Sequence, residues 1–232
     1  MSMTIGGSHA RASVHRGHTA ACGYLFAAPR WHNDLMGTRG FVGFVIDNTE
    51  KIFISHGDSY PSEVGSAVLS WLTGSRNALL NRAPGGVPDK VRALRLLDDE
   101  AERDPADIEW IRGLLRESPE WADSAGFIDD VSEEELLEFV TYDLDTLLEA
   151  GITGDGSEFP TDSLFCEWGY LIDLDAATFE VYRGFQRAPH DAGRFAHRPP
   201  AREHYYPVAL VASWPLANLP DRAGFLALLA AH

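Results

Sequence analysis

A group of polar residues at the two ends of one predicted hairpin is the strongest candidate for chemistry in this chain. A histidine beside a carboxylate is a common general base, an arginine suits a carboxylate or an oxyanion, and a hydroxyl can attack a substrate or donate to it. We expect catalytic roles for Thr38, Arg39, His56 and Asp58, and substrate binding by Ser59 and Tyr60.

The same residues also have a purely structural interpretation. The run from 58 to 62 is typical of a turn whose hydroxyls cap the following helix, and His56 then only hydrogen-bonds the backbone. The catalytic interpretation requires that the hairpin gather Arg39, His56 and Asp58 around one cavity.

The elements that position this group follow from the apolar pattern. Residues 40–46 and 51–56 are rich in β-formers and flank the polar run 47–50, which predicts a β-hairpin. Because the two ends of an antiparallel hairpin lie together, residues 38–39 should meet residues 56–58. A second hairpin is predicted at 165–173 and 178–182, and a final strand at 206–214.

In the middle of the chain, apolar residues recur at the spacing of an α-helix. Helices are expected at residues 62–73, 89–100, 104–116, 132–148 and 221–229. Asp104-Pro105 predicts a capped start, Ser132 to Glu135 a capping box, and Gly151 a helix end. Strands at both ends and helices between them predict an α+β fold. We expect an antiparallel sheet built from the N- and C-terminal hairpins, with a central acidic helical block packed on one face.

Residues 1–35 differ from the rest of the chain. No acidic residue precedes Asp34, and four of the nine histidines fall here. The apolar run 24–28 is too short and too late for a signal peptide, so we interpret the segment as a disordered leader. Met36 is an alternative natural start, and residues 36–232 are expected to form a single α+β domain. Two cysteines, expected to be reduced, fit the cytoplasm.

The charge of the chain is concentrated in one segment. The chain has 19 Lys and Arg against 35 Asp and Glu, a net charge of −16. Residues 98–149 hold 19 acidic residues and three arginines, so this segment alone has a difference of −16. No dense basic run exists, which argues against direct nucleic-acid binding and against anionic membranes. The acidic segment is either a solvated helix face or a surface for a basic partner.

Several kinds of site have no signature in the sequence. Walker-type, G-x-G-x-x-G, H-E-x-x-H and G-x-S-x-G motifs do not occur, so no cofactor and no metal site are expected. Asp173 and Asp175 are attributed to a hairpin turn, Cys166 to the core, and the histidines of residues 187–204 to a solvated loop. No run approaches the ~18 apolar residues of a membrane span.

Two resemblances bear on function. Gly37-Thr38 before a glycine-rich hairpin resembles the start of N-terminal-nucleophile hydrolases, which implies cleavage after Gly37, Thr38 as nucleophile and Asp58 after the second strand. The basic residue of that family has no equivalent, because Lys51 falls inside the second strand.

The second resemblance is closer. Met36-Gly-Thr-Arg-Gly and the later His56-x-Asp-Ser-Tyr-Pro resemble a family of bacterial and phage proteins for which no activity is established. The similarity covers residues 36 to 71 and supports Met36 as the start.

Two functions therefore remain open. The first is a hydrolase of a small polar or amide substrate, with its site at the end of the first hairpin. The second is a non-catalytic acidic protein, of phage or defence origin, that binds a basic partner or mimics nucleic acid. The oligomeric state is not predicted.

Overall fold

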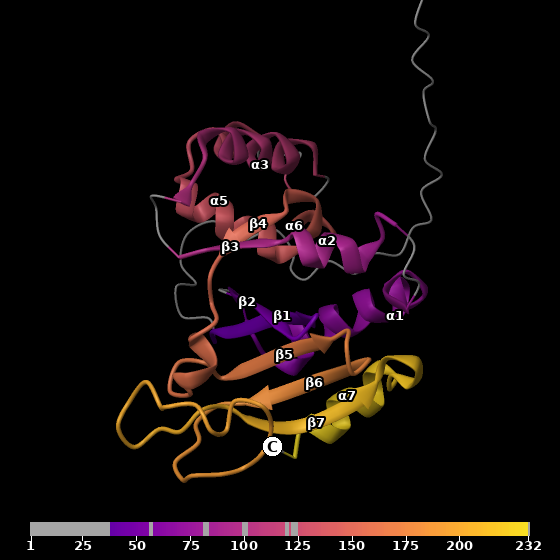
Figure 1. Ribbon diagram of the computed structural model, residues 1–232, viewed down its shortest axis with the longest axis vertical. Helices are drawn as coiled ribbons and strands as arrows, with labels where there is room; N and C mark the ends of the chain where they lie inside the picture. The colour runs from indigo at the N-terminus through magenta and orange to yellow at the C-terminus, as the bar shows by residue number, and fades with distance from the viewer. Residues whose placement is uncertain are drawn as a thin grey trace, which may run out of the picture.

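The computed structural model describes residues 38–55, 58–80, 84–98, 102–118, 121 and 125–231. Its main element is a five-stranded sheet in the order β2-β1-β5-β6-β7. The strands are β1 (Gly40–Ile46), β2 (Thr49–Ser55), β5 (Trp168–Asp173), β6 (Thr178–Arg183) and β7 (Ala209–Pro215). The expected α+β class is confirmed (Figure 1).

The two predicted hairpins form and lie side by side in the sheet. Neighbouring strands are antiparallel, except that β1 pairs with β5 in parallel, so the sheet is mixed. The parallel pair arises because β1 and β5 are the first strands of their hairpins and meet at the centre of the sheet.

A two-residue turn closes the first hairpin. Asp47 and Asn48 both have positive φ, 51° and 59°, which matches the twist of the strands they join. The Asp175 carboxylate, in the turn of the second hairpin, accepts hydrogen bonds from both backbone N–H groups, at 3.0 and 2.8 Å. The attribution of Asp175 to a hairpin turn is thus confirmed, and its side chain also fixes the neighbouring turn.

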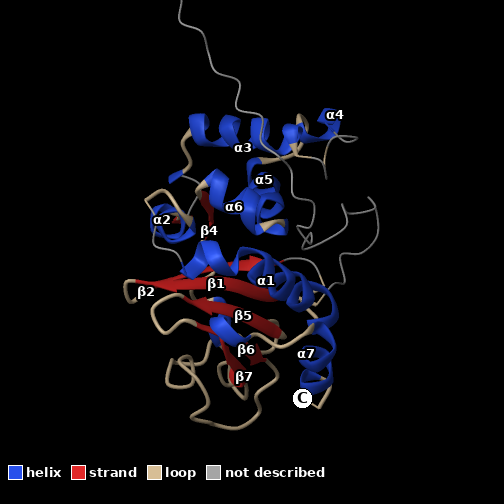
Figure 2. Cartoon of the chain, turned by 90° about the vertical axis from the view of Figure 1, so that its right-hand side faces the viewer, coloured by secondary structure: helices blue, strands red, loops and turns tan. Residues whose placement is uncertain are grey.

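Helices cover one face of the sheet. They are the π-helical turn η1 (Pro61–Gly65), α1 (Ser66–Leu80), the short η6 (Leu216–Asn218) and α7 (Arg222–Leu229). Figure 2 shows α1 and α7 along one side of the sheet. The final helix is where the sequence predicts it, and the Asp221 carboxylate caps it by accepting from the Gly224 N–H.

The acidic segment and the elements that flank it form a compact block, called the acidic block, beyond β2 (Figures 1 and 2). Its elements are α2 (Val87–Ala93), β3 (Arg95–Leu97), α3 (Pro105–Glu117), α4 (Ala125–Ile128), α5 (Glu133–Phe139), η4 (Val140–Tyr142), α6 (Leu144–Ala150) and β4 (Ile152–Gly154). One continuous apolar core joins the block to the helix-covered face of the sheet.

The ends of these helices follow the sequence closely in some places and depart from it in others. The Asp104 cap, the capping box of Ser132 and Glu135, and the end at Gly151 are all confirmed. The expected helix 132–148 is divided instead, because Asp143 caps a new helix through the Thr146 N–H. The expected helix 89–100 is also wrong in its second half, where β3 pairs in parallel with β4.

The opposite face of the sheet is covered by a long connection between β6 and β7. The expectation of a solvated loop is wrong at its centre: Phe195 is completely buried and packs edge-on against Phe41 and Tyr182, with ring centroids 5.5 and 4.9 Å apart. His190 links two parts of this connection. Its Nδ1 accepts a hydrogen bond from the Ala192 N–H, and its Nε2 therefore donates to the Pro207 carbonyl.

Within the part of the chain that the structure describes, no helix has the length and apolar character that crossing a membrane requires.

Candidate functional site

The structure joins the two ends of the first hairpin through Thr38 and Ser59. The Ser59 N–H donates to both the backbone oxygen and the Oγ1 of Thr38, at 3.0 and 3.1 Å. The Tyr170 hydroxyl donates to the Ser59 carbonyl at 2.7 Å, which fixes this turn against the centre of the sheet. His56 lies outside the described residues.

The remaining predicted site residues differ sharply in exposure. The Ser59 side chain is completely buried against Gly40, where a Cβ would lie 2.6 Å from that of Ser59, so the serine hydroxyl does not reach solvent. Arg39 and Asp58 are exposed, and Tyr60 is 44% exposed. Backbone contacts therefore join Thr38 and Ser59, while the side chains of Asp58 and Tyr60 face solvent.

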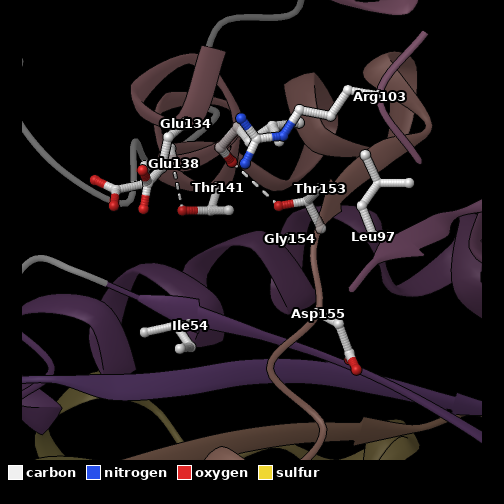
Figure 3. Close-up of a pocket in the computed structure, with 10 residues that line it drawn as sticks. Ile54, Leu97, Arg103, Glu134, Glu138, Thr141, Thr153, Gly154 and Asp155 are labelled. Atoms are coloured by element: carbon white, nitrogen blue, oxygen red, sulfur yellow. Dashed lines mark hydrogen bonds between the residues drawn. The ribbon is translucent and has the colours of Figure 1, made fainter. Parts of the chain in front are cut away.

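A cleft opens between the acidic block and the free edge of β2. It consists of an inner cavity of about 210 Å³ and an outer cavity of about 650 Å³, which share Ile54 and Asp155. The polar residues that line the inner cavity are Arg103, Glu134, Glu138, Thr141, Thr153 and Asp155 (Figure 3).

Glu138, on α5, is the most perturbed carboxyl group of this cleft. Its pKa is raised to about 6, first by burial and then by the nearby carboxylates of Glu134 and Glu135, while the Arg39 guanidinium opposes the rise. The predicted residue Arg39 is thus close enough to act electrostatically on the inner cavity. Figure 3 shows Glu134 and Glu138 side by side at one end of the cavity.

Arg103 reaches into the same cavity from the start of α3. Its side chain is 19% exposed, and its Nε is buried without a hydrogen-bond partner in the structure as described. The one ion pair that it forms among the described residues is with Glu133, at a long 3.9 Å. A buried donor without an acceptor costs about 1–3 kcal/mol, so an acceptor for this Nε–H would be favourable.

Loops border the outer cavity on both sides. The Gly156 N–H donates to the Ile52 carbonyl at 2.9 Å, which brings the loop after β4 against the edge of β2. Asp155 accepts from the backbone and hydroxyl of Ser157, and Asp162 accepts from Arg202 Nε at 2.8 Å through each oxygen. These two carboxylates hold loops in place.

The sequence prediction missed both Glu138 and Arg103, which belong to the segment interpreted as an acidic surface. A signal existed for the first: Glu134 and Glu138 are four residues apart on a predicted helix and so share a face. No sequence signal identifies Arg103, because its burial depends on the packing of α3 against α5.

Cys166 and a metal site are the two other candidates considered from the sequence. Cys166 is completely buried, which raises the pKa of its thiol well above the ordinary value, and its attribution to the core is confirmed. Among the described residues, no three of the His, Cys, Asp and Glu side chains are arranged to hold a metal ion.

Comparison of the chain with protein-family models, with curated proteins and with solved structures found no match.

Proposed function

We propose that the protein is a hydrolase of a small polar substrate, and that the inner cavity beside β2 is its active site. The observation that carries the proposal is Glu138, a partly buried carboxyl group with a pKa of about 6 in the wall of a cavity. A carboxyl group tuned to this range can accept and return a proton near neutral pH, and such groups concentrate at functional sites.

The proposed reaction uses water as the nucleophile. The Glu138 carboxylate takes a proton from a water molecule while the water oxygen attacks the carbonyl carbon of an amide. The C–N bond then breaks, and the proton held by Glu138 passes to the departing nitrogen, which leaves as an amine beside a carboxylic acid. Arg39 supports the ionised form of Glu138, and Arg103 is available to an anionic group of the substrate.

This mechanism retains the hairpin in a revised role. Thr38 and Ser59 fix the turn that begins β1 and so position Arg39, whose charge acts on Glu138. A nucleophilic Thr38 stays a separate prediction, which intact mass would test by revealing a chain that begins at that residue.

The test is hydrolysis of a panel of p-nitroanilides and p-nitrophenyl esters of small amino and hydroxy acids between pH 4.5 and 8.5. We expect the rate to rise with pH through about 6, as Glu138 ionises, and Glu138→Gln to lower kcat by ~10²-fold or more. Glu117→Gln, an exposed carboxylate at the end of α3, is the charge-matched control and should behave as wild type. Hydrolysis by Glu138→Gln at the wild-type rate, or none by the wild type, would refute the proposal.

A second candidate is supported by an exposed aromatic side chain in the acidic block. Trp110 is 51% exposed and follows Glu109 on α3, and Figure 1 shows α3 at the end of the molecule away from the sheet. A tryptophan face flanked by negative charge suits the guanidinium of a basic partner.

This second function would be tested with a nona-arginine peptide by calorimetry at 25 and 150 mM salt. Binding should weaken at the higher salt, because exposed charges are then screened within ~8 Å. Trp110→Ala should weaken it at least fivefold, while Phe185→Ala, an exposed ring outside the block, should not. Equal binding by the two variants would exclude the surface around Trp110.

A further inference from the structure

Both hydroxyl groups that line the inner cavity already donate their protons to backbone carbonyls. The Thr141 hydroxyl donates to the Glu138 carbonyl at 2.7 Å, and the Thr153 hydroxyl donates to the Leu137 carbonyl at 3.1 Å (Figure 3). A hydroxyl has a single proton, so both threonines can offer only oxygen lone pairs to a ligand. Ionised Glu134 and Glu138 also accept only.

Arg103 is therefore the one side-chain donor among the residues that line the inner cavity. Its guanidinium has five N–H groups in a fork that matches a carboxylate, and the Nε–H is buried with no acceptor in the described chain. The long contact with Glu133 does not replace such an acceptor, because 3.9 Å is beyond hydrogen-bond range. Figure 3 shows the Arg103 guanidinium apart from the Glu134 and Glu138 carboxylates within the same cavity.

We propose that the inner cavity binds a compact molecule with a carboxylate at one end, held by Arg103, and a nitrogen donor at the other, held by Glu134 and Glu138. This inference rests on the proposed function and gives the substrate class: an amino acid or a small amide derived from one. The cavity of about 210 Å³ has the volume of roughly seven water molecules, which is enough for an amino acid.

The test is calorimetric binding to the full chain at pH 7.5. The probes are L-asparagine, L-glutamine and the ω-amino acids from glycine to 6-aminohexanoate. Each is compared with the matching carboxylic acid without nitrogen and the matching amine without carboxylate. We expect at least one bifunctional probe to bind ten or more times tighter than both of its matched analogues. If none does, the proposed division of the cavity is wrong.

Two variants assign the two ends. Arg103→Gln should reduce the affinity for the bifunctional probe to that of its amine analogue, and Glu138→Gln should reduce it to that of its acid analogue. Arg92→Gln, on α2, removes an exposed arginine outside the cavity and should leave affinity unchanged. Arg103→Lys keeps the charge but not the fork, and serves if Arg103→Gln does not fold. Wild-type affinity in the Arg103 variants overturns the inference.

The two proposals fail in different ways. Selective binding of bifunctional probes without hydrolysis of any matching amide refutes the catalytic role and leaves the inference standing. Hydrolysis of substrates that lack a carboxylate, as efficient as that of substrates that have one, refutes the inference and leaves the catalytic role standing.

Discussion

Arg103 and Arg194 are covered to a similar degree but are partnered very differently. Their side chains are 19% and 25% exposed. Arg194 lies in the β6–β7 connection and hydrogen-bonds two sheet residues, Asp173 at 2.5 Å and Glu180 at 3.1 and 3.2 Å. Arg103 has no hydrogen bond within the described residues and one distant ion pair.

The difference separates an arginine paired with two carboxylates from one whose buried Nε has no partner among the described residues. Burial alone would lower the pKa of the Arg194 guanidinium, but its bonds to Glu180 and Asp173 raise it above the ordinary value. The Tyr182 hydroxyl donates to Glu180 at 2.6 Å and completes this group. Among the described residues, Asp173 and Glu180 pair with Arg194, which holds the β6–β7 connection against the sheet, whereas the buried Nε of Arg103 has no partner.

Phe195→Ala, next to the paired arginine Arg194, is expected to give the largest loss of stability. The ring is completely buried next to Arg194, so its removal should lower the free energy of unfolding by about 4 kcal/mol, measured in urea. Phe185→Ala, in the same connection but 40% exposed, should cost about 0.5 kcal/mol or less. Equal losses would mean that Phe195 does not anchor the loop.

The arginines themselves should respond in opposite directions. Arg194→Met leaves Asp173 and Glu180 without their cation, and should lower the free energy of unfolding by about 3 kcal/mol. Arg103→Met removes a buried donor that has no acceptor, so stability should stay within about 1 kcal/mol of wild type or rise. Urea denaturation of both variants under one condition measures the two changes in the free energy of unfolding. A larger loss for Arg103→Met than for Arg194→Met would contradict the prediction.

A smaller effect is expected in how the stability of the protein depends on pH. Because the pKa of Glu138 is raised to about 6 in the folded protein, its protonated form favours folding, and this contribution is lost as pH rises from about 4.5 through 6. Glu138→Gln should therefore stabilise the protein at pH 7.5 by about 1 kcal/mol, allowing for partial exposure, and have no effect at pH 4.5. Thermal melts at the two pH values decide; a loss of stability at pH 7.5 would mean that Glu138 is held by favourable contacts.

The parts of the fold that were predictable are those set by local chemistry. The hairpin turn within the predicted run 47–50, the caps at Asp104 and Ser132, and the end at Gly151 each depend on residues within a few positions. Their side chains satisfy nearby backbone groups, so the sequence alone specifies them.

The parts that were not predictable depend on contacts between distant segments. β3 has a helical pattern in the sequence but becomes a strand because it pairs with β4, more than 50 positions later. Phe195 lies in a stretch without periodicity, and only the apolar patch of Phe41 and Tyr182 gives it a place in the core.

The candidate site was predictable in part. The sequence predicts that residues 38–39 meet residues 56–58; the structure joins Thr38 to Ser59, one position beyond that run, and the Arg39 charge acts on Glu138 in the cavity. Glu138 and Arg103 were missed because their environment is created by packing α5 and α3 beside β2, which no local pattern specifies. The catalytic roles of Thr38, Arg39, His56 and Asp58 remain predictions.

The parallel pairing of β1 with β5 constrains how the protein is made. β1 is buried along its whole length, yet Phe41 has its partner Gly169 128 positions further along the chain. A ribosome releases the first hairpin long before the strand that completes it, and closing so long a loop slows folding. The apolar surfaces of this early hairpin are therefore exposed during translation, which makes the nascent chain a natural client for a chaperone until β5 emerges.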